Sequence, residues 1–311
     1  MKQSNHLFSI ILLFCALFSN NIFAQKDSAT GDSKKSYFKF NLNYLSNAIY
    51  SGRKDSATVP YLRPSIGYYD KSGFFISSEL SLLVSSDEPK RIDLISLESG
   101  YNFSITKKMD AGLYASKFFY SNASFAVGSE LKGLAGIYLG YNPGAIAINI
   151  GGDLLFSTNT DLNASVAISH EFESGEENNR WTFNPTAQLN AGTQYFNKAY
   201  YEFRKFNFTT SNSGSGSNGS GKGKGRGHSN SSNGGTTNTV KTLTFTNGNR
   251  FTILDYEFSF PINYDTKRWG LFGLPVVAVP VNAATYTLDN TIQKEKLSTA
   301  FFVEIGAYIK F

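Results

Sequence analysis

Cysteine is nearly missing from this sequence. The 311-residue chain has a single cysteine, Cys15, inside the apolar run LFSIILLFCALF near its start. Lys2 precedes this run and SNNIFA follows it, so residues 1–24 have the charged start, apolar centre and small final residue of a cleaved secretory signal peptide. The run is about half the ~20 residues that a membrane-spanning helix needs. Cleavage after Ala24 would leave no cysteine, which excludes disulfides, thiolate catalysis and thiolate metal sites.

Long apolar runs are also missing from the rest of the sequence. After residue 24 no segment has 18 consecutive apolar residues, which excludes membrane-spanning helices. Proline is scarce, with 8 residues, and long apolar stripes at the helical period do not occur. Charged residues make up 17% of the chain and its formal net charge is +5. This small basic excess on an exported chain argues against a nucleic-acid partner.

What the sequence does contain is alternation of apolar and polar residues, the period-2 pattern of β-strands. In RWTFNPTAQLN, for example, Trp181, Phe183 and Leu189 share one face, and Thr, Asn and Gln residues share the other. The pattern predicts twelve strands, at 37–47, 59–69, 73–84, 92–103, 109–120, 130–141, 145–156, 162–172, 180–196, 251–262, 270–282 and from 297 to the C-terminus.

The connections between these segments alternate between short and long. Counted along the chain, the odd-numbered connections are the longer ones, and they include AIYSGRKDSAT and the region 197–250. The even-numbered connections, such as DKS and NPG, are short. Short turns on one side and long loops on the other are typical of a bacterial outer-membrane β-barrel. We therefore predict an all-β fold, a closed antiparallel transmembrane β-barrel of about twelve strands in an up-and-down meander. It would occupy residues 37–311, after a polar periplasmic tail at 25–36.

A soluble β-sandwich or water-soluble barrel is the competing interpretation. Such folds place the apolar face inward and usually carry many Lys and Glu residues on the polar face. Here the polar face is rich in Asn, Gln, Ser, Thr and Gly, as expected for a wet lumen. Aromatic residues also gather near strand ends, for example Tyr68, Tyr69, Trp181 and Trp269, as in the interfacial girdles of membrane barrels.

The final segment EIGAYIKF resembles the C-terminal targeting signal of outer-membrane barrels. The matching residues are Glu304, Gly306, Ile309 and the terminal aromatic Phe311. The stretch YLSNAIYSGR more weakly resembles the first strand of porin-like proteins. These resemblances imply a Gram-negative outer-membrane location, contact with the lipid bilayer and lipopolysaccharide, and insertion by the barrel-assembly machinery. They assign no catalytic or binding residue, and the oligomeric state stays open.

The region 197–250 is predicted to be an extracellular hairpin that continues the ninth and tenth strands beyond the membrane. Its tip, residues 211–238, is Gly/Ser/Asn-rich and cannot bury enough surface to fold. Lys222, Lys224 and Arg226 make this tip basic. Either the tip is simply a solvated loop, or its charge attracts anionic lipopolysaccharide or surface glycan.

Residues for catalysis, cofactor binding or metal binding are not apparent. After signal removal only two histidines remain, His170 and His228. His228 lies in the predicted disordered tip, and His170 is expected at the lipid-facing periplasmic end of a strand. A phospholipase-like barrel needs a histidine near the outer leaflet, beside a serine. We therefore predict no enzyme activity, no cofactor and no metal site.

Charged residues with the parity of the polar face define the candidate lumen. These are Arg63, Glu79, Glu98, Asp153, Glu171, Asp255, Glu257 and Glu304. They form either salt bridges that brace a narrow barrel or an acid-lined path that favours cations. The leading functional hypothesis is a porin-like passive channel for small solutes, and the alternative is a non-conducting surface barrel that binds glycan, lipopolysaccharide or protein. Inward side chains such as Tyr114, Tyr138 and Tyr308 are able to fill a narrow lumen, so the sequence leaves pore and plug both open.

Overall fold

The computed structural model describes residues 35–54, 58–85, 89–121, 124, 131–176, 178–195, 244–245, 248–288 and 291–311. The predicted signal peptide, the tail up to residue 34 and nearly all of the 197–250 insert lie outside these ranges. Lys222, Lys224, Arg226 and His228 lie outside them as well. The described part of the chain contains no helix with the length and apolarity needed to cross a membrane.

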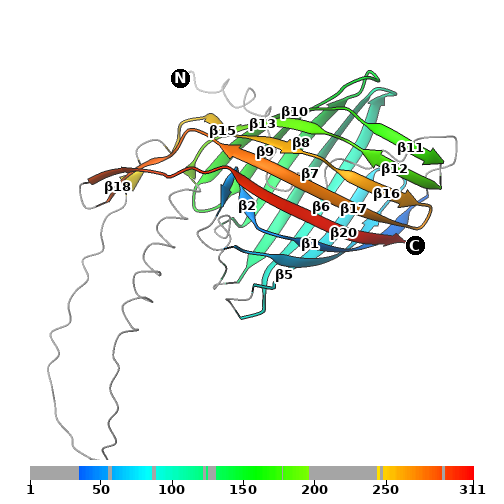
Figure 1. The fold of residues 1–311 in the computed structure, drawn as a ribbon, viewed down its shortest axis with the longest axis horizontal. Helices are drawn as coiled ribbons and strands as arrows, with labels where there is room; N and C mark the ends of the chain where they lie inside the picture. The colour runs from blue at the N-terminus through cyan, green and yellow to red at the C-terminus, as the bar shows by residue number, and fades with distance from the viewer. Residues whose placement is uncertain are drawn as a thin grey trace, which may run out of the picture.

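Twelve antiparallel strands close into one barrel (Figure 1). Three of them are each interrupted once, so that two consecutive strand labels form one barrel strand. In chain order the barrel strands are β1 (Tyr37–Leu45), β4 (Tyr61–Tyr69), β5 (Phe74–Leu83), β6 (Arg91–Thr106), β7 (Met109–Tyr120), β8 (Gly133–Tyr141), β9 (Ala147–Phe156), β10 (Thr160–Ser169) with β11 (Phe172–Glu176), β12 (Asn179–Phe183) with β13 (Thr186–Gly192), β15 (Thr252–Ser259) with β16 (Ile262–Thr266), β17 (Trp269–Pro280) and β20 (Ala300–Lys310).

Each barrel strand pairs with the next in the chain, and β20 pairs with β1 to close the circle. Closure leaves no free edge along the wall, which satisfies the backbone groups in lipid. The short turns and the C-terminus lie at one end, here called the turn end, and the long connections lie at the other, the loop end (Figure 1). The predicted fold class, strand count and topology are confirmed.

Small strands accompany the barrel at its loop end. The connection between β1 and β4 contains a hairpin of β2 (Ile49–Tyr50) and β3 (Arg53–Lys54). A separate three-stranded sheet joins β14 (Thr244–Phe245), β18 (Thr285–Leu288) and β19 (Thr291–Lys294). It brings together two connections that are far apart in the sequence.

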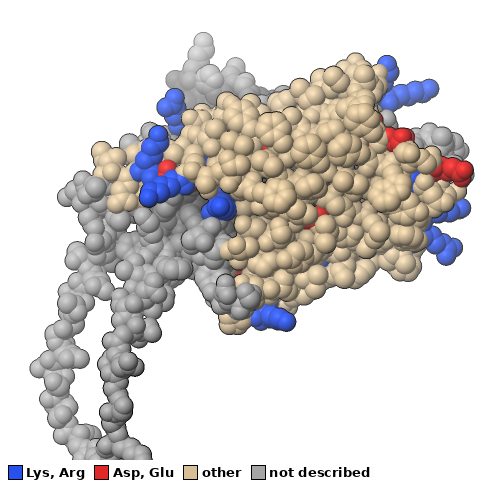
Figure 2. Space-filling view, viewed as in Figure 1, with Lys and Arg blue, Asp and Glu red and all other residues tan. Residues whose placement is uncertain are grey.

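Side chains alternate between the outside and the inside of the barrel. In β20, Phe301, Ile305 and Ile309 are exposed, whereas Phe302 and Glu304 are buried. Figure 2 shows the consequence: the barrel wall on this face is almost free of charge, and Lys, Arg, Asp and Glu gather towards the two ends. Such an uncharged outer band suits contact with lipid hydrocarbon.

Three prolines form a seam across neighbouring strands within the wall. The backbone N–H of His170 donates to the carbonyl of Pro185, that of Asn184 to Pro261, and that of Phe260 to Pro275, at 3.3, 2.9 and 3.1 Å. Proline lacks an N–H, so it normally interrupts a sheet interior. Here each proline carbonyl still accepts a bond from the next strand, which keeps the wall continuous where β10, β13 and β15 are interrupted.

Inward glycines make room for tyrosine rings in the lumen. A Cβ on Gly136 would lie 2.5 Å from Cζ of Tyr114, and one on Gly112 would lie 2.2 Å from Cε1 of Tyr138. A Cβ on Gly270 would meet Tyr308 at 2.5 Å. The rings therefore lie flat over glycine backbone, and the lumen is narrowed by packed side chains.

Candidate functional site: the barrel lumen

A group of four polar side chains from four strands, here called the brace, joins β1, β4, β5 and β20. Three of the side chains are buried, and the fourth, that of Glu79, is 13% exposed. Its centre is Arg63, whose Nη2 lies 2.6 Å from Glu79 Oε1 and whose Nη1 lies 3.2 Å from Glu304 Oε1. Asn43 Nδ2 donates to the same Glu304 oxygen at 3.0 Å. Because strand register fixes all four backbones, the guanidinium has little freedom to leave its two carboxylates.

The opposite part of the wall, formed by β9, β10, β13 and β15, is acidic, and the described residues of these four strands include no Lys or Arg. Asp153 of β9 is opposite Asn163 of β10 in the register, and Asn190 of β13 is opposite Asp255 of β15. Asp153 Oδ1 accepts a 2.6 Å bond from the hydroxyl of Tyr114, and Asp255 Oδ1 accepts one from Asn190 Nδ2 at 2.6 Å. Among the described residues, buried carboxylates outnumber buried guanidiniums. The carboxylates are Asp93, Asp153, Asp161, Asp255 and Glu304, and the guanidiniums are Arg53 and Arg63.

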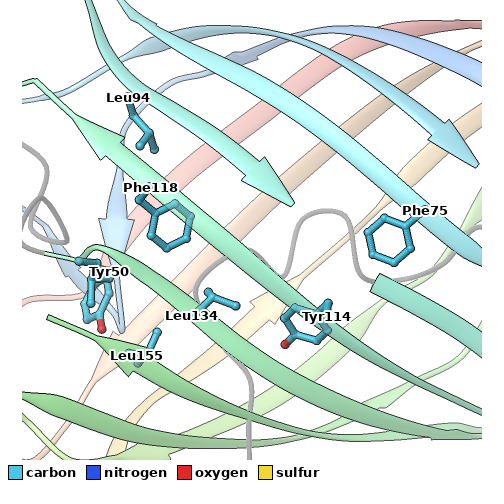
Figure 3. Close-up of a cluster of buried hydrophobic side chains, with 8 residues drawn as sticks. Tyr50, Phe75, Leu94, Tyr114, Phe118, Leu134 and Leu155 are labelled. Carbon is cyan, nitrogen blue, oxygen red and sulfur yellow. The ribbon is translucent and has the colours of Figure 1, made fainter. Parts of the chain in front are cut away.

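The hairpin of residues 49–54, here called the lumen hairpin, folds into the barrel. Its two turn residues, Ser51 and Gly52, have φ values of 46° and 71°, as a tight two-residue hairpin of type I′ requires. Tyr50 is 5% exposed and belongs to a buried cluster with Phe118, Leu134 and Leu155 from β7, β8 and β9 (Figure 3). Burial of an aromatic ring among wall residues holds this side of the hairpin inside the lumen.

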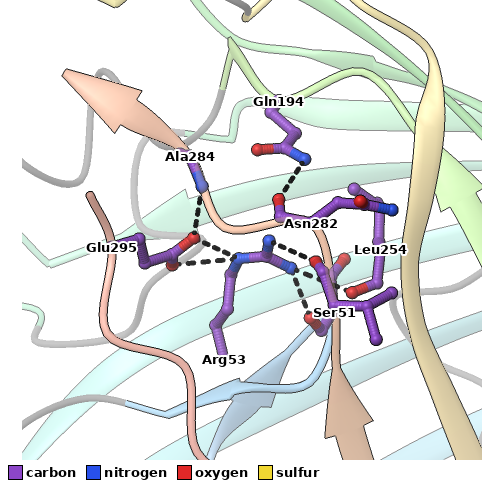
Figure 4. A network of polar contacts seen from close by, with 8 residues as sticks. Ser51, Arg53, Gln194, Leu254, Asn282, Ala284 and Glu295 are labelled. Carbon is purple, nitrogen blue, oxygen red and sulfur yellow. Dashed lines mark hydrogen bonds and ion pairs between the residues drawn. The ribbon is translucent and has the colours of Figure 1, made fainter.

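The other side of the lumen hairpin is held by Arg53 (Figure 4). Its Nε lies 3.0 Å from Oε1 of Glu295, and the two side chains are 5% and 7% exposed. Its Nη1 donates to the carbonyls of Ser51 at 2.8 Å and Leu254 at 3.4 Å, and its Nη2 donates to that of Val281 at 3.4 Å. We call the Arg53–Glu295 pair the latch.

The sequence did not indicate that this connection folds inward. The length and position of AIYSGRKDSAT predict only one of the long loops. Its composition does contain one signal, because Ser51-Gly52 between Ile49-Tyr50 and Arg53-Lys54 is typical of a short hairpin. The residue types alone, however, do not specify whether a hairpin points into the lumen or into the solvent.

The predicted lumen residues lie in different settings. Arg63, Glu79 and Glu304 meet in the brace, whereas Asp153 and Asp255 lie on the acidic wall. Two others are partly buried: Glu98 accepts a 2.9 Å bond from Ser116 Oγ, and Glu257 of β15 is two residues from Asp255. Glu171 differs from the rest because it is exposed, in the break between β10 and β11.

The predicted targeting residues lie in the closing strand and at its end. Glu304 is inward in the brace, and a Cβ on Gly306 would be 2.6 Å from the ring of Phe272. Ile309 points outward, and the exposed Phe311 exchanges backbone bonds of 2.9 and 3.2 Å with Phe38. The pairing makes the last residue part of the barrel wall. Recognition by the barrel-assembly machinery stays a prediction.

His170 lies at the turn end, at the break between β10 and β11. Its Nδ1 contacts the carbonyl of Ala145, and its ring packs edge-on against Phe172 with centroids 4.3 Å apart. These contacts are those of an interfacial ring. Within the described ranges, no group of three or more His, Cys, Asp or Glu side chains is arranged to hold a metal ion.

At the turn end, Asp70 caps the β4–β5 turn. Its carboxylate accepts hydrogen bonds from Ser36 Oγ at 2.7 Å, from the Ser72 backbone N–H at 2.9 Å and from the Tyr68 hydroxyl at 3.1 Å. Hydrogen bonds from Ser72, and then from Ser36, lower the pKa of Asp70 well below its usual range. The interaction ties the residue preceding β1 to the first turn.

Comparison with known proteins yields structural neighbours only. No protein-family model and no curated protein matches the chain. Among solved structures, the KdgM porin aligns at 8% identity over 88% of this chain and 99% of its own, with a TM-score of 0.43. The NanC porin aligns at 9% identity over 88% and 100%, with a TM-score of 0.42. The COG4313 outer membrane channel from Pseudomonas putida F1 aligns at 8% identity over 91% and 99%, with a TM-score of 0.41. The barrel assignment rests on this chain's own strand register and closure.

Proposed function

We propose that the protein is a porin-like passive channel for small solutes in the bacterial outer membrane. The observation that carries the proposal is the inverted distribution of side chains: apolar residues face outward around a closed wall, and charged residues are buried inside it. A closed barrel in lipid needs no polar interior for its own stability, whereas passage of hydrated solutes does. The turn end would face the periplasm, and lipid and lipopolysaccharide would surround the wall.

The charge of the lumen supports a preference for cations. The brace pairs Arg63 with two carboxylates, and the acidic wall carries Asp153 and Asp255. Rings or walls of Asp and Glu favour cations in channels. In a planar bilayer separating unequal KCl concentrations, we expect a reversal potential of the sign that indicates K⁺ selectivity. Anion preference would contradict this part of the proposal.

A non-conducting surface barrel is the second candidate, and the lumen hairpin is the observation that favours it. A hairpin anchored to the inner wall narrows the path at the loop end. Single-channel recording distinguishes the candidates. Purified protein that shows the heat-shifted gel mobility of a folded barrel is expected to give discrete conductance steps. If neither the wild type nor a variant deleted of residues 49–54 conducts, the channel proposal is rejected.

A further inference from the structure

We propose that the lumen hairpin is a plug and that the surface hairpin β18–β19 holds it closed through the latch. The proposal rests on the channel function proposed above. It adds a conformational device: displacement of a loop on the outer side would release an element inside the lumen.

The first argument is that the lumen hairpin reaches opposite sides of the barrel. Ile49 packs against a buried cluster from β17 and β20 that contains Leu274, Val276 and Phe302. The next residue, Tyr50, belongs to the cluster on β7, β8 and β9. In the circular strand order β8 and β20 are half a turn apart. Two consecutive residues therefore bridge the lumen.

The second argument is that the tip of the hairpin fits closely against the wall on a third side. A Cβ on Gly52 would lie 2.9 Å from Cβ of Asp255 and 3.0 Å from Cβ of Pro280. Ser51 and Arg53 on either side are buried. Backbone at this distance from β15 and β17 leaves no space for a solute to pass between the tip and that wall.

The third argument is that Glu295, the acidic partner in the latch, is attached to the surface hairpin. Glu295 follows β19, and its backbone N–H donates to the Ala284 carbonyl at 2.8 Å. Its Oε2 accepts a 3.0 Å bond from the Ala284 N–H. The carboxylate is thus fixed to the base of the surface hairpin, not to a barrel strand. Any movement of β18–β19 carries the charge partner of Arg53 with it.

Loss of the latch would favour the open state. Removal of the Glu295 carboxylate makes burial of the Arg53 guanidinium less favourable, so transfer of this side chain into water becomes more favourable by comparison. The hairpin would therefore leave the lumen and take Arg53 into solvent. A ligand that binds the surface hairpin better in its displaced position would shift the same equilibrium.

The test measures the exposure of the lumen hairpin by the rate of thiol labelling, which does not require the barrel to conduct ions. Ser51→Cys introduces a thiol of similar size at the buried tip, in a chain whose other cysteine, Cys15, lies in the predicted signal peptide. In folded protein in liposomes we expect slow reaction with a membrane-impermeant maleimide. Adding Glu295→Gln is expected to raise the rate by roughly tenfold or more, because the exposed state changes from a minor to a major population. Arg53→Met, which also removes the ion pair, is expected to raise the rate by a smaller factor, because methionine has no charge that favours water.

The matched control is Glu173→Gln. It removes a carboxylate from another Arg–Glu pair, Arg180–Glu173 at 3.3 Å, which lies at the exposed turn end. Its labelling rate is expected to equal that of the parent. Single-channel conductance is measured on the same proteins, and Glu295→Gln is expected to increase the open fraction.

The outcomes separate the two proposals. Faster labelling with no current in any variant would support the plug and reject the channel. Currents in the wild type, with labelling and open fraction both unchanged by Glu295→Gln and Arg53→Met, would overturn the latch and leave the channel standing.

Discussion

The brace and the latch use the same chemistry in different settings. Both join an arginine that is 5% exposed to a glutamate, and in both the shortest charged contact is at most 3.0 Å. The brace partners lie on barrel strands whose register with their neighbours fixes their backbones. The latch partners lie on a hairpin and a surface connection. A buried ion pair is therefore as rigid as the elements that carry it. The elements that carry the latch are the ones that are able to move and expose their charges to water.

Breaking the brace should have the largest effect. Arg63→Met leaves Glu79 and Glu304 facing each other without their cation, and the strand register holds both residues in place. We expect the free energy of unfolding, measured by urea titration in detergent micelles or bilayers, to fall by about 3–5 kcal/mol. Arg53→Met is the comparison variant and is expected to cost less than Arg63→Met, because the Glu295 carboxylate that it leaves behind lies on a surface connection and not on a barrel strand. Equal losses would show that the latch is as integral to the wall as the brace.

The rigidity of the wall can be tested without touching a charge. Gly136→Ala places a Cβ 2.3 Å from Asp153 Oδ1 and 2.5 Å from the Tyr114 ring, both held by the 2.6 Å bond between them. Overpacking of this kind costs about 1–3 kcal/mol, measured by the same urea titration. Gly273→Ala is the matched control, since a Cβ there meets nothing within 4 Å. Equal free energies of unfolding for the two variants would show that the wall accommodates the added Cβ and is less rigid than proposed.

These two settings also explain what the sequence was able to predict. Alternation predicts which side chains of β20 face inward, because a strand has only two faces. In a barrel surrounded by lipid the apolar face must point outward, so the polar face points into the lumen. The parity argument thus selected Arg63, Glu79 and Glu304, although it did not specify that they meet. Their meeting depends on barrel closure between β1 and β20, which no local pattern contains. The position of Tyr50 depends on packing across the lumen, so a loop assignment was all that local composition supported.

A smaller effect is expected at the turn of the lumen hairpin. Gly52 has φ of +71°, a conformation that costs an L-residue roughly 1–2 kcal/mol. Its added Cβ would also press on Asp255 and Pro280. Gly52→Ala should therefore speed labelling at Ser51→Cys several-fold while leaving the unfolding free energy of the barrel nearly unchanged. A loss of global stability without faster labelling would place the hairpin among the fixed parts of the molecule.

The smallest effect is expected at Asp70, a surface carboxylate held by hydrogen bonds and not by an ion pair in a closed lumen. Its pKa is lower in the folded barrel than in the unfolded chain, so its contribution to stability is complete above the ordinary carboxyl pKa. That contribution is lost as the pH falls through the lowered folded-state value. Asp70→Asn should be slightly less stable than the wild type at pH 7, and the difference should shrink as the pH is lowered into the strongly acidic range. Ser36→Ala removes one donor to the same carboxylate, so it should show part of the effect with the same sign. A wild-type advantage that grows on acidification would contradict this assignment and would mean that the Asp70 carboxyl is stabilised in its protonated form.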